Sequence, residues 1–416
     1  MKKIGIVCIV ALVVLLLPAM VFAGGQDEGK GNVTFYMALY DGLDQEFLDE
    51  LEAGFMAENP DLSLEIVPVQ WDRLRDKVTT AIAGGNPPDG SIIDTNWILE
   101  FMPLDAIDDI HQYVSKETTD NVFDSTKVGQ FGPRLMGLPV AAGARIMAVN
   151  TEITTKVPRT LEEMREEAIR VNNPPNTYGY VMPGKKYIEL TDFAYYVYAA
   201  GGDFFERGAD GSYGKCIVNS PACVKALKFM TQLGNVDKVV QDGWIAMDRM
   251  ETHPIFYAGK AAYVFIGSWV ESAMKEQGAT FKTVYAPIPG FEGQTPTSLV
   301  VVDNIAIYKD AKNKEGMGKF LDFFYQDEWK ARFDEMVGFP PVTISASKLP
   351  QFKNPLYDAL AEAAKYGKGW TPMVEGWSEA RDIIWDQIVQ VFLGRKEAQP
   401  ALDEAAKAID ELRGIN

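Results

Sequence analysis

Apolar and polar residues follow two different periods along the first hundred residues. Short apolar runs of strand length occupy residues 33–39, 62–69 and 91–93. Between them, residues 44–56 and 72–83 place apolar side chains three and four positions apart, which is the spacing of one helix face. The order strand, helix, strand, helix, strand predicts the start of a parallel α/β sheet.

The same pattern returns later in the chain. Thr160 followed by Glu163 is a capping-box signature, and it opens a predicted helix whose inward face is Leu161, Met164, Ala168 and Val171. Residues 402–412 form a second amphipathic pattern and predict a terminal helix. We find no internal repeat and no flexible linker, so the chain is expected to cross between lobes on short ordered segments.

The N-terminus is predicted to be a cleaved signal peptide, residues 1–23. Lys2 and Lys3 precede an apolar run over residues 4–17, and a small-x-small pattern ends at Ala23. A membrane anchor is the alternative, but the run is short and a polar stretch follows it. Cys8 lies inside the apolar run and no cysteine stands at the cut. We therefore expect a soluble periplasmic protein without a lipid tether.

Composition narrows the class of protein. The 416 residues include 40 basic and 58 acidic side chains, are 47% apolar and carry a formal charge of −18. This mixture excludes wholesale disorder and a polytopic membrane protein, and the length predicts two or three compact units. The acidity argues against general nucleic-acid binding, which needs a basic surface.

Cysteine and histidine are scarce. Cys216 and Cys223 flank a predicted strand end and helix start, and spacing leaves a local disulfide and two buried thiols equally open. His111 and His253 are far apart in the sequence and have no ligand-like neighbours. We expect no metal site and no cofactor.

Catalytic signatures are mostly missing from the sequence. Residues 24–30 approach a phosphate-binding loop, but they precede the first strand instead of following one. No G-x-S-x-G elbow and no H-E-x-x-H motif occur. A glycoside hydrolase stays open at this point because the 58 acids could supply a carboxylate pair.

Aromatic residues beside polar turn residues give the main indication of function. Asp94, Asn96 and Trp97 directly follow the third predicted strand, and Trp269 follows Gly267 and Ser268. Ligands of α/β sheets bind outside the carboxyl ends of strands. A ring there can stack on a sugar face while acids and amides bind hydroxyls. These turns lack the Arg and Lys clusters that a phosphate or carboxylate would require.

Several segments resemble the extracellular solute-binding proteins of carbohydrate ABC importers, over essentially the whole chain after residue 23. Their order and spacing are more specific than any one of them. The segments are Phe55–Asp61, Leu64–Val69, Thr80–Asp89, Met136–Val140, Val149–Asn150, Ala199–Asp203, Phe256–Ala262, Gly267–Trp269, Asp303–Ile307 and Gly338–Pro341.

The resemblance implies an α/β, two-lobed periplasmic binding protein type II fold with a ligand cleft between the lobes. One lobe would hold residues 31–140 and 304–338, and the other residues 141–303 and 339–416. A mono- or oligosaccharide would stabilise the closed form, which is delivered to the membrane permease subunits. The resemblance further implies a protein without enzyme activity, and we expect a monomer.

Cleft residues are predicted from the strand ends and the resemblance together. Arg145 could instead form a surface ion pair, residues 191–195 a buried helix face, and Phe339 and Trp370 core packing. At Asp303 and Asn304 the family more often has glycine and an apolar or aromatic residue. The predicted ligand-binding residues are Asp41, Asp94, Asn96, Trp97, Arg145, Thr191, Asp192, Tyr195, Trp269, Asp303, Asn304, Phe339 and Trp370.

Other solutes and roles remain open from the sequence. A polyamine would suit acids and rings through cation–π contacts, and a sugar phosphate is a further alternative. A sensor partner cannot be told from a transporter partner. The particular sugar and its chain length are not encoded in any motif that we find.

Overall fold

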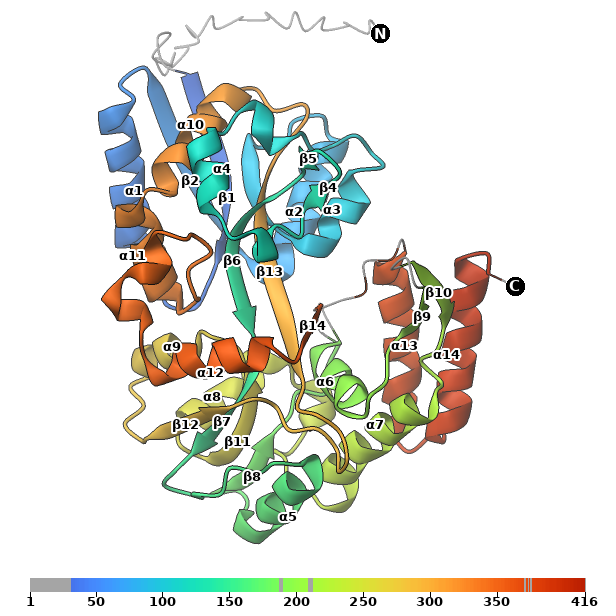
Figure 1. The fold of residues 1–416 in the computed structure, drawn as a ribbon. Helices are drawn as coiled ribbons and strands as arrows, with labels where there is room; N and C mark the ends of the chain where they lie inside the picture. The colour runs from blue at the N-terminus through green and yellow to red at the C-terminus, as the bar shows by residue number, and fades with distance from the viewer. Residues whose placement is uncertain are drawn as a thin grey trace, which may run out of the picture.

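The fold is seen in a computed structural model that describes residues 31–186, 190–208, 212–369, 372, 374 and 376–415. The predicted signal peptide lies outside these residues. Figure 1 shows an upper and a lower lobe joined by strands that run from one into the other. Among the described residues, no helix is long and apolar enough to cross a membrane.

The upper lobe is built on the strand and helix alternation predicted from the sequence. β1 (Gly31–Leu39) pairs in parallel with β2 (Leu62–Gln70) and with β3 (Gly90–Asp94). The helices of this lobe are α1 (Gln45–Glu58), α2 (Trp71–Ala83), α3 (Thr95–Phe101), α4 (Lys116–Asn121), α10 (Lys314–Phe324) and α11 (Asp327–Val337). The predicted β-α-β-α-β order is therefore confirmed.

Two strands carry the chain between the lobes. β13 (Ser298–Ile307) is antiparallel to β3 through its second half and to β6 (Leu138–Ala144) through its middle. Its first residues pair in parallel with β14 (Gly367–Gly369). Figure 1 shows β6 and β13 passing side by side from one lobe to the other. The middle parts of these two strands therefore lie where the lobes meet.

A mixed sheet forms the centre of the lower lobe. β7 (Ile146–Asn150) lies between β12 (Thr283–Ala286) and β11 (Ala261–Ile266), and β8 (Tyr178–Val181) pairs in parallel with β11. Two small hairpins lie apart from the main sheets: β9 (Phe205–Arg207) with β10 (Tyr213–Cys216), and β4 (Gln130–Phe131) with β5 (Arg134–Leu135). Figure 1 shows the second of these in the upper lobe. The helices of this lobe are α5 (Leu161–Val171), α6 (Thr191–Ala199), α7 (Pro221–Thr231), α8 (Arg249–Tyr257), α9 (Val270–Glu276), α12 (Pro355–Ala364), α13 (Trp377–Phe392) and α14 (Ala398–Leu412).

Each lobe buries its own hydrophobic core. One cluster unites the upper sheet with α1, α2, α10 and α11, and it includes Phe339 and Val342. Two clusters cover the two faces of the lower sheet, one with α5, α6, α7, α13 and α14, the other with α8, α9 and α12. The residue limits of the lobes given above stay a prediction.

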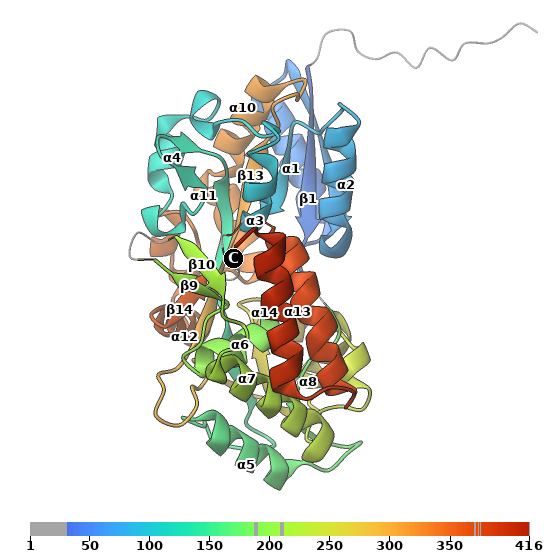
Figure 2. The same cartoon turned by 90° about the vertical axis from the view of Figure 1, so that its right-hand side faces the viewer.

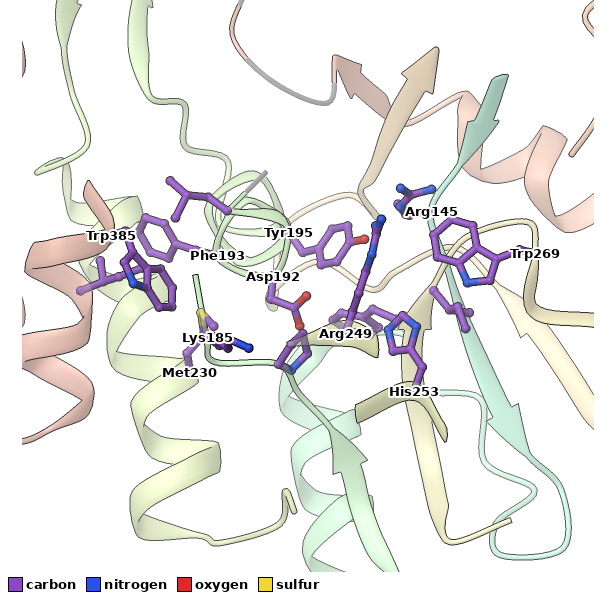
Figure 3. A pocket seen from close by; sticks show the side chains of 15 residues that line it. Arg145, Lys185, Asp192, Phe193, Tyr195, Met230, Arg249, His253, Trp269 and Trp385 are labelled. Atoms are coloured by element: carbon purple, nitrogen blue, oxygen red, sulfur yellow. The ribbon is translucent and has the colours of Figure 1, made fainter. Parts of the chain in front are cut away.

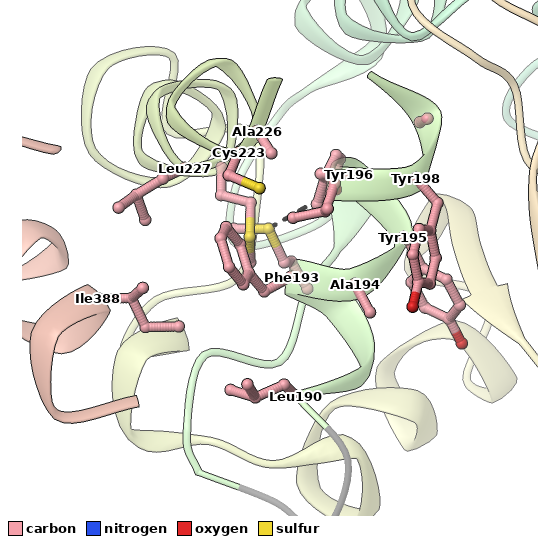
Figure 4. Packing of buried hydrophobic residues seen from close by; sticks show 14 of the residues in the cluster. Leu190, Phe193, Ala194, Tyr195, Tyr196, Tyr198, Cys223, Ala226, Leu227 and Ile388 are labelled. Atoms are coloured by element: carbon pink, nitrogen blue, oxygen red, sulfur yellow. Dashed lines mark hydrogen bonds between the residues drawn. The ribbon is translucent and has the colours of Figure 1, made fainter. Parts of the chain in front are cut away.

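α6 lies in the largest of these clusters. Figure 4 shows Phe193 and Tyr196 of α6 among Cys223 and Leu227 of α7, with Ile388 of α13 nearby. Cys216 and Cys223 are both buried and free, so the structure favours two thiols over a disulfide. Burial raises the pKa of Cys216 to about 12, which keeps its thiol protonated.

The C-terminal helices form a pair beside the lobe boundary. α13 and α14 lie side by side in Figures 1 and 2, next to the boundary between the lobes. The Ser378 hydroxyl, at the start of α13, donates to Glu100 Oε1 of α3 at 2.8 Å. α13 therefore belongs to the lower core and also contacts the upper lobe.

The predicted helix start at Thr160 is confirmed, with one correction. The Thr160 hydroxyl accepts from the Glu163 amide at 3.1 Å, as an N-cap should. The Glu163 carboxylate, however, accepts from the amide of Arg159 at 3.0 Å, one residue before the cap.

Candidate ligand-binding cleft

The main candidate pocket lies in the lower lobe where it faces the upper one. It contains about 550 Å³ of space not filled by protein atoms, part of it open to solvent. Its walls come from α6, α7, α8 and α13, the end of β11 and the residues after β6 and β8. Figure 3 shows Asp192, Tyr195, Arg249 and Trp269 around this space.

Trp269 is placed by the sharp turn after β11. A Cβ atom at Gly267 would lie 1.9 Å from the Trp269 ring, so only glycine allows the ring to fold back over that turn. The ring lies 6.3 Å from Phe339 of the upper lobe and 6.4 Å from His253, nearly parallel to the imidazole. It thus stands where the two lobes meet.

Two guanidinium groups face the same ring. The Cζ of Arg145 is 4.5 Å from the Trp269 ring centroid and that of Arg249 is 5.4 Å from it. Arg145 is 3% exposed, so it is not on the surface, and its amide donates to the Leu299 carbonyl at 3.0 Å. Both arginines add electrostatic attraction to the ring face, where a cation is favoured.

His253 is held in its neutral form. Burial, followed by the charges of Arg249 and Arg145, lowers its pKa to about 3. The imidazole therefore offers one donor and one acceptor at neutral pH and carries no charge. This environment is suited to hydroxyl groups.

α6 contributes the residues opposite Trp269. Asp192 and Tyr195 both line the pocket, as predicted, and Tyr195 is 2% exposed with its ring 5.7 Å from Phe265. The Tyr180 hydroxyl donates to Asp192 Oδ2 at 3.4 Å. Thr191 begins the helix, and its side chain lies outside the described residues.

The upper lobe presents acids toward the same space. Asp94 ends β3 and Asp303 lies directly opposite it in β13, each 5% exposed. The Tyr40 hydroxyl donates to Asp303 Oδ2 at 2.9 Å. Burial and the neighbouring Asp94 charge raise the pKa of Asp303 to about 7, although Tyr40, Arg145 and Arg249 act in the opposite direction.

Asp41 and Asn96 lie in the upper lobe, just after β1 and β3. Burial raises the pKa of Asp41, and the nearby Arg249 partly offsets this rise. Asp94 Oδ1 caps α3 by accepting from the Asn96 amide at 2.8 Å, and the Asn96 side-chain amide donates to the same oxygen. Asn96 Oδ1 is buried without a protein partner, which leaves an acceptor for a ligand hydroxyl.

Of the predicted residues, the pocket wall contains Arg145, Asp192, Tyr195 and Trp269, and it does not contain the upper-lobe residues Asp41, Asp94, Asn96 and Asp303. Trp97, Asn304 and Phe339 are not part of this wall either. Trp97 is 3% exposed and packs edge-on against Trp71, 6.1 Å away, in the upper core. Asn304 is fully buried and donates to Thr95 Oγ1 at 2.8 Å. Phe339 is 4% exposed and belongs to the upper core while touching Trp269. Trp370 lies outside the described residues.

Sequence reasoning missed several pocket residues that stand on helices. Arg249 is the first residue of α8, whose start is fixed by a capping box between Asp248 and Glu251. His253 lies one turn further on the same helix, and Trp385 belongs to α13. The Asp248-x-x-Glu251 signature was readable and could have placed Arg249 and His253 on one helix face.

Possible metal ligands occur throughout the part of the chain that the structure describes. Within the described ranges, no group of three or more His, Cys, Asp or Glu side chains is arranged to hold a metal ion.

The Lys185 ammonium at the pocket rim pairs with Asp248 at 3.0 Å. The pocket is equipped for hydrogen bonding and ring contact.

Comparison with curated proteins gives relatives along most of the chain. A binding protein of Brucella abortus is 27% identical over 406 residues, covering 96% of this chain and 97% of the relative. The maltotriose-binding protein of Pyrococcus abyssi is 24% identical over 350 residues, covering 81% of this chain and 72% of its own. The sn-glycerol-3-phosphate-binding periplasmic protein of Escherichia coli is 22% identical over 421 residues, covering 93% and 94%.

Comparison with solved structures shows the same fold. A maltose-bound protein of T. maritima superposes with a TM-score of 0.81 at 21% identity, covering 92% of this chain and 99% of that one. A solute-binding protein of Thermotoga lettingae bound with α-D-tagatose reaches 0.83 at 20% identity, covering 91% and 99%. The two-lobed periplasmic binding fold predicted from the sequence is confirmed. The family model for bacterial extracellular solute-binding proteins matches residues 36–331, and this chain belongs to that family.

Proposed function

We propose that this protein is the substrate-binding component of an ABC importer and takes up a mono- or oligosaccharide. The sugar would bind between the lobes and be delivered to the permease when the lobes close. The proposal is carried by the composition of the pocket, where the Trp269 ring lies together with Arg145 and Asp192. The facing lobe adds acidic side chains. A ring with hydrogen-bonding groups around it suits the mixed apolar and hydroxylated surface of a pyranose.

The charges of the two lobes favour an uncharged solute. Arg145 and Arg249 on the lower side lie near Asp41 and Asp303 on the upper side, as their mutual effects on pKa indicate. Such opposite charges satisfy each other across the cleft. A neutral polyol can join this network as donor and acceptor without leaving a buried charge uncompensated.

Closure follows from contacts made to both lobes at once. A sugar on Trp269 would meet lower-lobe groups in any arrangement, and it would meet Asn96 and Asp94 only when the upper lobe is near. The second set of contacts supplies differential affinity for the closed form, and this difference shifts the population. No covalent step is involved.

The relatives support the wider role. Maltose, maltotriose and tagatose appear in the names of proteins with this fold. We accordingly infer a monomeric, extracytoplasmic protein without enzyme activity, which works with the membrane permease subunits of its importer.

A thermal-shift and calorimetry screen tests the proposal. A panel of mono- and oligosaccharides should contain a member that raises the Tm in a concentration-dependent way, because a ligand of the native state stabilises it by mass action. Polyamines and sugar phosphates in the same panel should leave the Tm unchanged. Binding of only those solutes, or turnover of chromogenic glycosides, would contradict the proposal.

A further inference from the structure

The pocket of the lower lobe has two chemically different ends. At one end, Trp269 stands among Arg145, Arg249 and His253, and Figure 3 shows Trp385, Phe193 and Met230 at the other. Asp192 and Tyr195 lie between these ends in the same view. The apolar side chains of the second end are Leu190, Phe193, Met230, Trp385 and Ile388, and the charged Lys185 is drawn next to Met230 in Figure 3.

The apolar end has a definite origin in the fold. Leu190 and Phe193 flank the start of α6, Met230 stands near the end of α7, and Trp385 and Ile388 share one face of α13. Phe193 and Met230 are each 2% exposed, while Trp385 is only half-buried. The end is therefore an edge of the lower core that lines the pocket, and Figure 4 shows Phe193 and Ile388 within that core.

A sugar alone does not need such a surface. Hydroxyl groups placed against Leu190, Met230 and Ile388 would lose their hydrogen bonds to water without finding new partners. These three side chains also lack the flat ring face that a pyranose stacks on, and the rings of this end are those of Phe193 and Trp385. An apolar group placed there gains from burial, because it extends a core that is already dry.

We propose that the natural ligand is a glycoside with an apolar aglycone. Its sugar would lie at the Trp269 end and its aglycone between α6 and α13, against Phe193, Met230 and Trp385. This inference rests on the proposed function and names the substrate class of the same site.

Matched glycosides test the inference by calorimetry. Methyl, phenyl and hexyl glycosides of glucose, galactose and mannose carry the same sugars with different aglycones. Comparing the affinities for the phenyl and hexyl forms shows whether the pocket prefers an aryl or an alkyl aglycone. For a sugar that binds, the phenyl or hexyl form should bind about tenfold or more tightly than the methyl form. Equal affinities would overturn the inference and leave sugar binding intact. If no glycoside or free sugar binds, the proposed function fails, and the inference fails with it.

Variants locate the effect in the structure. Met230→Gln places an amide in the apolar end and should reduce the ratio of phenyl to methyl affinity by about fivefold or more. Met250→Gln is the matched control, because Met250 is 54% exposed and lies outside the pocket wall. Trp385→Ser, at a half-buried position, gives a second test if Met230→Gln does not fold. An unchanged ratio in the folded variants would overturn the inference.

Discussion

The two sides of the cleft differ in what they offer a ligand. The lower lobe provides a hollow, a ring and two arginines, all fixed by the helices around them. The upper lobe provides buried acids, among them Asp94 at the end of β3 and Asp303 directly opposite it in β13. The lower lobe is thus built to hold a ligand, and the upper lobe to complete its contacts.

The upper lobe also contains a buried ion pair, and burying two charges costs free energy. Lys330 and Asp334 of α11 form an ion pair in which both side chains are fully buried. Burial lowers the pKa of Lys330 and raises that of Asp334 to about 7. Their role is expected in stability, since neither lines the pocket.

Breaking this pair should give the largest effect. Lys330→Met leaves Asp334 buried without its cation, and we expect a loss of about 3 to 5 kcal/mol in the free energy of unfolding. Urea denaturation measures this loss, and ligand affinity of the folded fraction should not change. The double variant Lys330→Met/Asp334→Leu should recover most of the stability. A double variant as unstable as the single one would contradict the explanation.

The second effect concerns the lower lobe. Trp269→Ala removes the ring between Arg145 and Phe339, and affinity for the bound saccharide should fall about 30-fold or more, or about 2 kcal/mol. Calorimetry measures the loss. Trp329→Ala is the matched control, because Trp329 packs against Phe323, 5.3 Å away, in the upper lobe and does not line the pocket. Unchanged affinity in Trp269→Ala would remove the ring from the site.

The third effect tests the acids of the upper lobe through pH. Because the pKa of Asp303 is raised from 3.8 to about 7, the folded protein keeps a proton that the unfolded chain releases. Stability should therefore decrease as pH rises from about 4 to 7 and level off above it. Asp303→Asn should remove this decrease, which amounts to about 1.4 kcal/mol for each pH unit over which the folded and unfolded states differ in protonation.

The measurement is the Tm of both proteins at pH 5 and pH 7.5. Asp334 titrates in the same window and is present in both, so the difference between the two profiles isolates Asp303. A variant whose profile runs parallel to that of the parent protein would show that Asp303 does not titrate there.

The comparison also shows what sequence could and could not predict. The α/β alternation of the upper lobe followed from periodicity, because strands and amphipathic helices differ in spacing. The two-lobed arrangement followed from the family resemblance. In the site, the strand ends and the family resemblance together predicted Trp269, Arg145, Asp192 and Tyr195 as cleft residues, and these four line the pocket.

There are physical reasons why some predicted residues do not line the pocket and why some lining residues were not predicted. Trp97 follows a strand end like Trp269, but α3 begins at Thr95 and turns the ring inward onto Trp71. His253 and Trp385 lie on helices, where a pocket face and a core face have the same spacing in sequence. Which face meets the cleft depends on tertiary packing, and no local pattern contains that information.

The smallest effect is expected for the pair of acids Asp94 and Asp303. Asp94→Asn keeps the acceptor that caps α3, so its cost to stability should stay below about 1 kcal/mol. The substitution removes the negative charge that helps to raise the pKa of Asp303, which should therefore fall toward its usual value. The pH-dependent loss of stability should then be complete at a lower pH than in the parent protein. Tm profiles across pH 4 to 8 measure this shift, and a midpoint equal to that of the parent would show that burial alone controls Asp303.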